Sequence, residues 1–306
     1  MAAVLAGAVA VAGAVPRAGA FTVAVLRRDG LIVPFATWDG KHWRADWPRP
    51  EQNPDVPISL DSVPTRWWGD AAPAGTWRAW TDQPFPQTVG VRQPDWFKAQ
   101  CLRQIGLRTD YRGPEPPPPP TVQPYPKDGL ALSSSQPVDR IDIVPTGVAT
   151  DVMLDAFENA ESRLLDNARF LPEGVPRDPV DRTRVPLTIE ASYAFGKPPA
   201  PRYYYLEMSR EYDRRHTAES CAGVAFGAGW FVRGSAGDLK ALSLDVSLAD
   251  CDRYGLAYML PLGVARLNGH IYWIAQWSGW DYERYGIVEL TPKRAKPILT
   301  VYGGSC

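Results

Sequence analysis

The sequence FTVAVLRRDGLIVPFATWDGKHWRADW, residues 21–47, is the clearest indicator of the fold class. Two Asp-Gly pairs, Asp29-Gly30 and Asp39-Gly40, each separate two apolar or aromatic runs. Asp-Gly favours the positive φ angles of tight hairpin turns, so this pattern is a strong local signal for paired antiparallel strands. The chain is therefore expected to be mainly β and antiparallel.

Similar strand signals recur toward the C-terminus. Residues 187–193 alternate Leu, Ile, Ala and Tyr with Thr, Glu and Ser, and residues 242–248 alternate Leu and Val with Ser and Asp. Further apolar or aromatic runs lie at 202–209, 224–232, 263–267, 270–277, 286–290 and 297–302. Strands and helices do not alternate regularly, which argues against a parallel α/β sheet.

An internal similarity leaves two β architectures open. Residues 23–40 match residues 264–279 at several positions, including Trp38 with Trp277 and Gly40 with Gly279. Two copies at opposite ends of a chain suit a radial repeat such as a β-propeller. Hairpins with glycine turns in an antiparallel sandwich or barrel share the same pattern. The expected fold is therefore a sandwich or barrel, or is propeller-like.

One amphipathic helix is expected near residues 150–170. Met153, Phe157 and Leu164 recur at helical spacing, and Asp151 places a negative charge in the first turn, where it favours a helix. The proline at position 172 ends the pattern.

A proline-rich segment divides the chain. Residues 114–126 read PEPPPPPTVQPYP, a composition that favours an extended polyproline II linker. This division predicts a Trp-rich β region at 21–113 and a β-rich region containing the helix at 127–306.

Residues 1–20 are expected to be a secretory signal peptide. An apolar run from Ala2 to Val15 is followed by Pro16 and by Ala18-Gly19-Ala20, which matches an A-x-A cleavage site. The run is shorter than the roughly 20 residues that span a bilayer. We therefore expect an exported, soluble, periplasmic or extracellular protein with no membrane span. The excess of Arg over Lys and the many Ala, Gly and Pro residues suggest a bacterial, GC-rich genome.

The cysteines are expected to form disulfides. There are four, and in an exported protein paired cysteines are more common than thiols or metal ligands. One precedes the proline-rich segment and three follow it, so complete pairing requires a bond across that segment. Of the three possible connectivities we favour Cys221–Cys251 with Cys101–Cys306.

Few features point to chemistry. The net charge is −1 without a basic stripe, which argues against nucleic acid as the partner. No motif for a cofactor or a metal occurs, and enzymatic activity is uncertain. Glu190 and Glu207 lie on expected strands, and on one face they could serve as the carboxyl pair of a glycoside hydrolase. The alternative is that both are solvated side chains of half-buried strands.

The tryptophans are concentrated in two regions. The chain has 12, many of them in Pro-rich, turn-rich segments where burying every ring is difficult. Some must fill the core, but exposed rings would suit stacking on sugars or docking of a protein. The candidate binding residues are Trp38, Trp43, Trp67, Trp68, Trp77 and Trp277. The leading hypothesis is a non-catalytic binding or scaffold module for a glycan or an envelope protein, and the alternative is a glycan-acting hydrolase.

The mature protein should begin at or near Phe21. The reason is the small residues at Ala18 and Ala20, which signal peptidases recognise. N-terminal sequencing of exported material tests this expectation, and recovery of Met1 from that material would contradict it.

Overall fold

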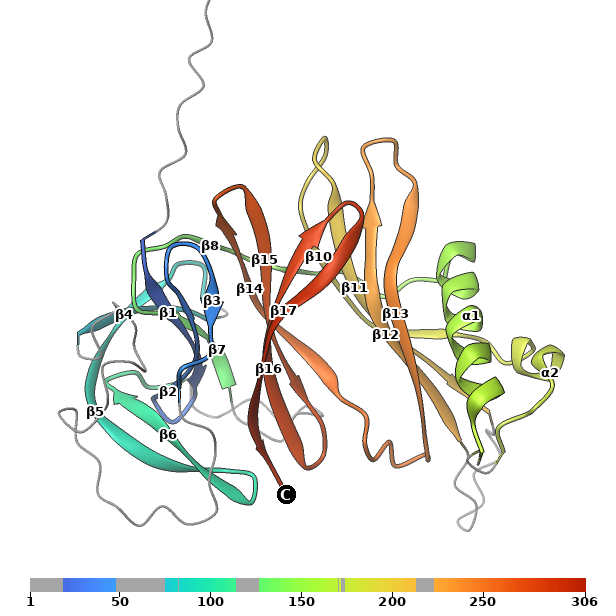
Figure 1. Cartoon of the computed structure of the whole chain (residues 1–306), viewed down its shortest axis with the longest axis horizontal. Coiled ribbons are helices and arrows are strands. Elements are labelled where there is room, and N and C mark those ends of the chain that lie inside the picture. The colour runs from blue at the N-terminus through green and yellow to red at the C-terminus, as the bar shows by residue number, and fades with distance from the viewer. Residues whose placement is uncertain are drawn as a thin grey trace, which may run out of the picture.

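The structure is a computed structural model, and it consists mainly of antiparallel β strands (Figure 1). It describes residues 19–47, 75–81, 83–113, 127–169, 171, 174–212 and 223–306. Within these ranges the strands form one seven-stranded and two five-stranded sheets. The predicted mainly antiparallel β class is therefore confirmed.

The first sheet closes into a six-stranded barrel. Its strands pair in a circle, and the short strand β3 adds to β2. In circular order they are β1 (Phe21–Arg27), β7 (Lys127–Leu132), β4 (Thr76–Trp80), β5 (Gln87–Ala99), β6 (Leu102–Thr109) and β2 (Leu31–Trp38), with β3 (Trp43–Arg44) outside the circle. The two predicted Asp-Gly hairpins join β1 to β2 and β2 to β3, and Gly30 and Gly40 have the positive φ that these turns require.

Strand β7 lies beyond the proline-rich segment in the sequence but belongs to the barrel. It pairs with both β1 and β4, so the barrel extends to Leu132 rather than ending at residue 113. The backbones approach closely at this seam, where a Cβ on Gly129 would collide with the carbonyl oxygen of Trp80. The segment 114–126 lies outside the described residues.

Two further sheets stack beside the barrel. The central sheet contains β8 (Val138–Asp139), β14 (Tyr258–Leu267), β15 (His270–Ser278), β16 (Tyr282–Thr291) and β17 (Arg294–Ser305). The outer sheet contains β9 (Asp142–Ile143), β10 (Thr188–Phe195), β11 (Arg202–Glu211), β12 (Val224–Arg233) and β13 (Leu239–Ala249). The described strands thus form a barrel and stacked sheets rather than radial blades, so the propeller-like alternative is wrong. The internal similarity marks two ordinary hairpins.

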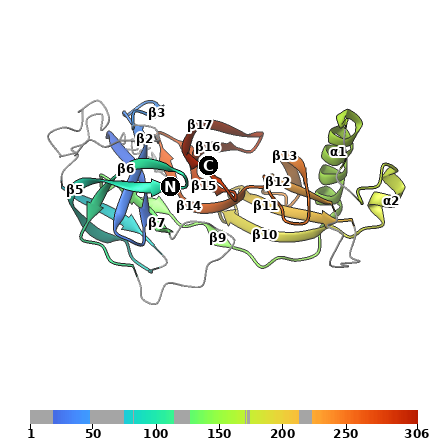
Figure 2. The same cartoon turned by 90° about the horizontal axis from the view of Figure 1, so that it is seen from below.

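The middle strands of the central sheet, β15 and β16, are largely buried on both faces. Along β15, Tyr272 and Ile274 pack with barrel residues, whereas Trp273 and Ala275 pack with residues of the outer sheet. Successive side chains of a strand point to opposite faces, so one strand contributes to both cores. The layers therefore run from the barrel through the central and outer sheets to the helices, as Figures 1 and 2 show.

Helix α1 (Asp151–Asn167) covers the outer face of the outer sheet, as the helical periodicity predicts. Phe157 is completely buried there, and its ring lies so close to β12 that a Cβ on Gly227 would approach it to 2.7 Å. The short helix α2 (Pro179–Thr183) was not expected from the sequence. Its local signal is Asp178, whose side chain accepts from the Val180 amide, followed by proline at the first helical position.

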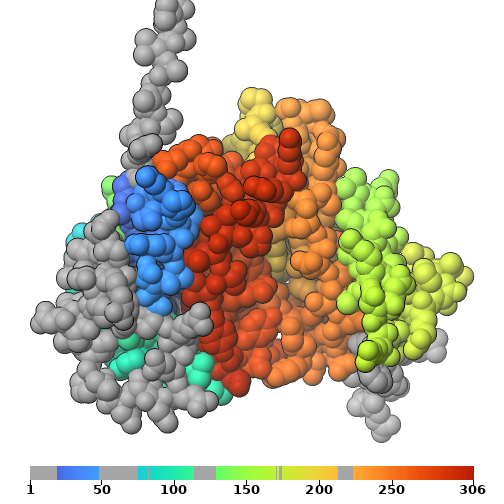
Figure 3. Space-filling view, in the orientation of Figure 1, coloured from blue at the N-terminus to red at the C-terminus, as the bar shows by residue number. Residues whose placement is uncertain are grey.

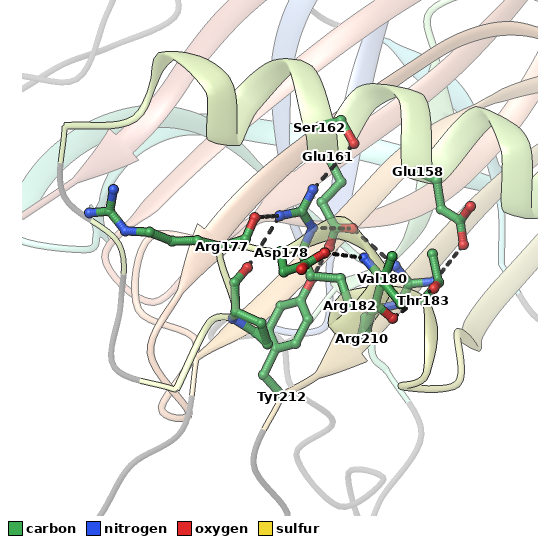
Figure 4. A network of polar contacts seen from close by, with 11 residues as sticks. Glu158, Glu161, Ser162, Arg177, Asp178, Val180, Arg182, Thr183, Arg210 and Tyr212 are labelled. Carbon is green, nitrogen blue, oxygen red and sulfur yellow. Dashed lines mark hydrogen bonds and ion pairs between the residues drawn. The ribbon is translucent and has the colours of Figure 1, made fainter.

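A buried ion network connects both helices to β11 (Figure 4). Arg210 donates to Glu161 and to Glu158, each at 3.0 Å, while the Tyr212 hydroxyl also donates to Glu161. The Arg182 guanidinium lies 3.5 Å from the same Glu161 carboxylate. Loss of one partner from a buried ion pair costs roughly 3–5 kcal/mol, because the other charge stays buried without compensation. The network therefore fixes the helices on the sheet.

A disulfide joins Cys101, in the turn after β5, to Cys306 at a sequence separation of 205 residues. This bond agrees with the favoured connectivity and crosses the proline-rich segment. Cys251 is disulfide-bonded as well, and Cys221, its expected partner, lies outside the described residues.

The double substitution Cys101→Ser/Cys306→Ser should destabilise the protein clearly. A loop of this length constrains the unfolded chain by up to about 5 kcal/mol in the loop-entropy model. Denaturant unfolding should show a lower midpoint for the variant. Phe85→Ala, at an exposed ring of the barrel, is the control and should leave the midpoint unchanged. Equal midpoints for the double variant and the wild type would contradict the expectation.

Candidate functional site

Three of the tryptophans expected at an exposed face are buried. Trp38 is 2%, Trp43 9% and Trp77 1% exposed, so the prediction of a binding face made from these three residues is wrong. Trp38 and Trp43 pack in the core between the barrel and the central sheet, and Trp77 packs in the barrel. The sequence does not reveal that the central sheet supplies the apolar surface that covers the first two. Trp67 and Trp68 lie outside the described residues.

Trp277 is only partly buried and lines a groove of about 450 Å³ between the outer and central sheets. We call it the inter-sheet groove. It lies where β13 and β17, the edge strands of the two sheets, approach each other. In the space-filling view the orange and red strands adjoin along this face (Figure 3). Its aromatic lining comprises Tyr205, Phe226, Trp230, Trp277 and Tyr282, and its polar lining includes Ser243, Asp245, Ser247, Arg284 and Thr300.

The Trp277 ring is held from three sides. Its indole lies over Gly286, where a Cβ would approach the ring to 2.7 Å. The guanidinium of Arg284, its cross-strand partner, lies 5.3 Å from the ring centroid, within the range of a cation–π contact. The indole Nε1 donates to the Tyr205 hydroxyl at 3.1 Å. The ring is therefore positioned before any ligand arrives.

Tyr205 continues this aromatic lining on the outer sheet. Its ring forms an edge contact with Trp230, with centroids 4.9 Å apart. Burial raises the pKa of Tyr205, and the nearby Glu207 carboxyl raises it further. The hydroxyl therefore stays protonated at neutral pH and keeps a proton to donate.

The polar lining comes from both walls. Ser243, Asp245 and Ser247 occupy every second position of β13 and face the groove, and Arg284 projects from β16. Asp245 and Arg284 are both exposed, and neither forms an ion pair with another residue in the part of the chain that the structure describes. The groove thus combines aromatic rings with hydrogen-bonding side chains, among which one carries a negative and one a positive charge.

The two carboxyls considered for hydrolysis lie outside this groove. Their strands, β10 and β11, do pair. Glu207 is buried, accepts from the Met259 amide at 2.5 Å, and has its pKa raised to about 8 chiefly by burial. Glu190 accepts from the Ser209 hydroxyl and lies 2.7 Å from the Arg253 guanidinium. Neither carboxyl is among the groove-lining residues. Glu207 joins the outer sheet to the central sheet, and Glu190 joins β10 to β11 and to the turn of Arg253.

Several lining residues were not singled out from the sequence. Trp230 carried no signal beyond its residue type, and Arg284 none at all. The polar half of the alternation at 242–248 was visible, but it predicts only that one face of a strand is polar. Which sheet lies opposite that face is a tertiary property, so Asp245 could not be assigned to a site.

Two features are absent from the described ranges. No group of three or more His, Cys, Asp or Glu residues there is arranged to hold a metal ion. No helix in those ranges has the length and apolar character needed to cross a bilayer.

Replacing Glu207 by Gln should remove a pH dependence of stability. The folded-state pKa of about 8 exceeds the ordinary value of 4.5, so the carboxyl binds its proton more tightly in the folded chain. The protonated carboxyl therefore adds to the free energy of unfolding. This addition is complete below about pH 4.5 and is lost as the pH rises through about 8. At about 1.4 kcal/mol per pKa unit, the loss is on the order of 5 kcal/mol.

Urea unfolding at a series of pH values measures this dependence. The wild type should lose stability from about pH 5 to pH 8.5, and Glu207→Gln should show a much flatter profile. Glu211→Gln, at a partly exposed carboxyl of the same strand, should keep the wild-type slope. A Glu207→Gln profile parallel to that of the wild type would show that Glu207 is not the titrating group.

Comparison with known proteins adds no assignment: no family model matches the chain, and no match was found among curated proteins or solved structures.

Proposed function

We propose that this protein is an exported, non-catalytic binding module whose inter-sheet groove holds part of a carbohydrate chain. The observation that carries the proposal is the lining of the groove. The partly exposed Trp277 ring is backed by the buried rings of Tyr205 and Trp230. Beside it lie the exposed side chains of Asp245 and Arg284, neither of which has an ion-pair partner among the described residues.

The chemistry of a sugar ring matches this lining. A pyranose has an apolar face of C–H groups, which packs on an aromatic ring, and a rim of hydroxyls that both donate and accept. Serine hydroxyls do both as well, a carboxylate only accepts and a guanidinium only donates. The volume of about 450 Å³ falls within the usual range of small-ligand sites. Trp277 supplies a preformed face, which lowers the entropic cost of binding.

The hydrolase alternative has weaker support. Hydrolysis by the common mechanisms needs two carboxyl groups on either side of the scissile bond. Asp245 is the one carboxylate among the described lining residues of the groove. Glu190 and Glu207 do lie on paired strands. However, Glu190 forms an ion pair with Arg253, and the buried Glu207 accepts from the Met259 amide.

Export is supported by two features. Residues 1–20 have the composition of a signal peptide, and β1 begins at Phe21, the expected first residue of the mature chain. The Cys101–Cys306 disulfide is a bond that persists in oxidising compartments.

Trp277→Ala should weaken carbohydrate binding at least tenfold, about 1.4 kcal/mol. The probes are soluble cello- and chito-oligosaccharides, titrated by calorimetry. Trp277→Phe keeps an aromatic face and should recover part of the affinity. Phe85→Ala, an exposed aromatic site on the barrel, should bind as the wild type does. Absence of binding in the wild type, or equal binding by Trp277→Ala, would overturn the proposal.

A further inference from the structure

We infer that the groove continues onto a second subsite formed by Tyr254 and Trp280, so that the ligand is an extended oligosaccharide rather than a single sugar unit. This inference rests on the proposed function. We call the two rings the aromatic shelf.

The shelf adjoins the groove through the chain itself. Gly255, the residue after Tyr254, lines the groove, and so does Tyr282, which follows Trp280 by two positions. The Tyr282 hydroxyl lies 3.5 Å from the Gly255 carbonyl and connects the two turns. A carbohydrate chain that leaves the groove at the end lined by Gly255 and Tyr282 therefore reaches the shelf next.

The two shelf rings are largely in solvent. Tyr254 is 58% and Trp280 67% exposed, and their centroids lie 6.5 Å apart with planes inclined at 59°. Large aromatic side chains usually lose more of their surface than this on folding, because burying them stabilises the fold. Their exposure together, beside a groove with further aromatic rings, points to use in binding.

Contacts at the shelf hold the rings in place. The Tyr254 hydroxyl donates to the Asp281 carboxylate at 2.7 Å, and the Tyr254 amide donates to the Asp252 carboxylate at 2.9 Å. These contacts limit the freedom of the Tyr254 ring and join the turn of Tyr254 to the turn of Trp280. A subsite that is ordered before binding loses less entropy when it binds.

Each turn is also anchored to the rest of the fold. The amide of Cys306, which is bonded to Cys101, donates to the Asp281 carbonyl at 2.7 Å. The turn of Tyr254 contains Cys251, which is disulfide-bonded, and Arg253, which adopts a φ of 58°. A positive φ is unfavourable for arginine. It is maintained here by the contacts of the guanidinium with Glu190, Glu211 and Tyr258.

A sugar unit fits the shelf better than a protein does. Stable protein interfaces bury about 800 Å² on each partner, which is far more than two rings offer. The carboxylates of Asp252 and Asp281 each accept a hydrogen bond from Tyr254 and retain capacity to accept from hydroxyl groups of a ligand that lies on the rings. A carbohydrate chain has both hydroxyl donors and an apolar face, and the groove already orients it toward this end.

The test compares a disaccharide with a hexasaccharide of the series that the wild type binds, either cello- or chito-oligosaccharides. In the wild type the hexamer should bind roughly tenfold more tightly than the dimer, because it reaches both subsites. Trp280→Ala should remove that gain and leave the affinity for the dimer unchanged. Trp280→Phe should keep most of the gain. Trp277→Ala should weaken the binding of both oligomers.

The possible failures are distinguishable. If neither oligomer binds the wild type, or if Trp277→Ala changes neither affinity, the proposed function is wrong and this inference falls with it. If Trp277→Ala weakens both oligomers but Trp280→Ala leaves the hexamer gain intact, the groove binds carbohydrate and the shelf does not. If Trp280→Ala weakens dimer and hexamer equally, the ring supports the shape of the groove and is not a second subsite.

Discussion

Burial of the middle strands of the central sheet on both faces is the constraint on which the rest of the structure depends. Along β15, alternate side chains enter the core shared with the barrel and the core shared with the outer sheet. A slip of one residue would exchange the two sets, placing Trp273 against the barrel and Tyr272 against the outer sheet. The packing of both neighbouring layers therefore specifies the register of this strand. The run IYWIA, which is apolar at every position, is typical of a strand with no solvent-facing side.

The inter-sheet groove is a consequence of the same stacking. The outer and central sheets share a core around Trp230 and Trp273, but toward the edge strands β13 and β17 the lining includes polar side chains. Gly286 lets the Trp277 indole lie close to the backbone of the sheet. The aromatic lining is thus the outer part of the core that the two sheets share. Toward solvent, polar side chains follow it instead of further apolar ones.

Buried polar groups connect the layers that apolar packing brings together. Glu207 of the outer sheet accepts from the Met259 amide of the central sheet, and the Arg210–Glu161 pair connects β11 with α1. The Cys101–Cys306 bond connects the barrel with the last strand of the central sheet. Each contact needs defined partners, whereas apolar packing alone would accept several arrangements of the same layers. The turn that carries Trp280 lies beside the Cys101–Cys306 bond, and the turn that carries Tyr254 is held by the ion pairs of Arg253.

Local patterns in the sequence were sufficient for the hairpins at Gly30 and Gly40, the strands β10 to β13 of the outer sheet and the helix around Phe157, because turn chemistry and periodicity act between neighbouring residues. The parity of the cysteines also indicated the bond from Cys101, since the number of cysteines on each side of a segment restricts their pairing. Trp277 was named from the sequence, but Asp245 and Arg284 could not be joined to it. Three features depend on how distant parts of the chain pair and pack. They are the place of β7 in the barrel, the burial of Trp38 and Trp43, and the position of Glu207 outside the groove. Those contacts join residues often more than 100 positions apart, and periodicity describes one strand at a time, so only the tertiary structure decides them.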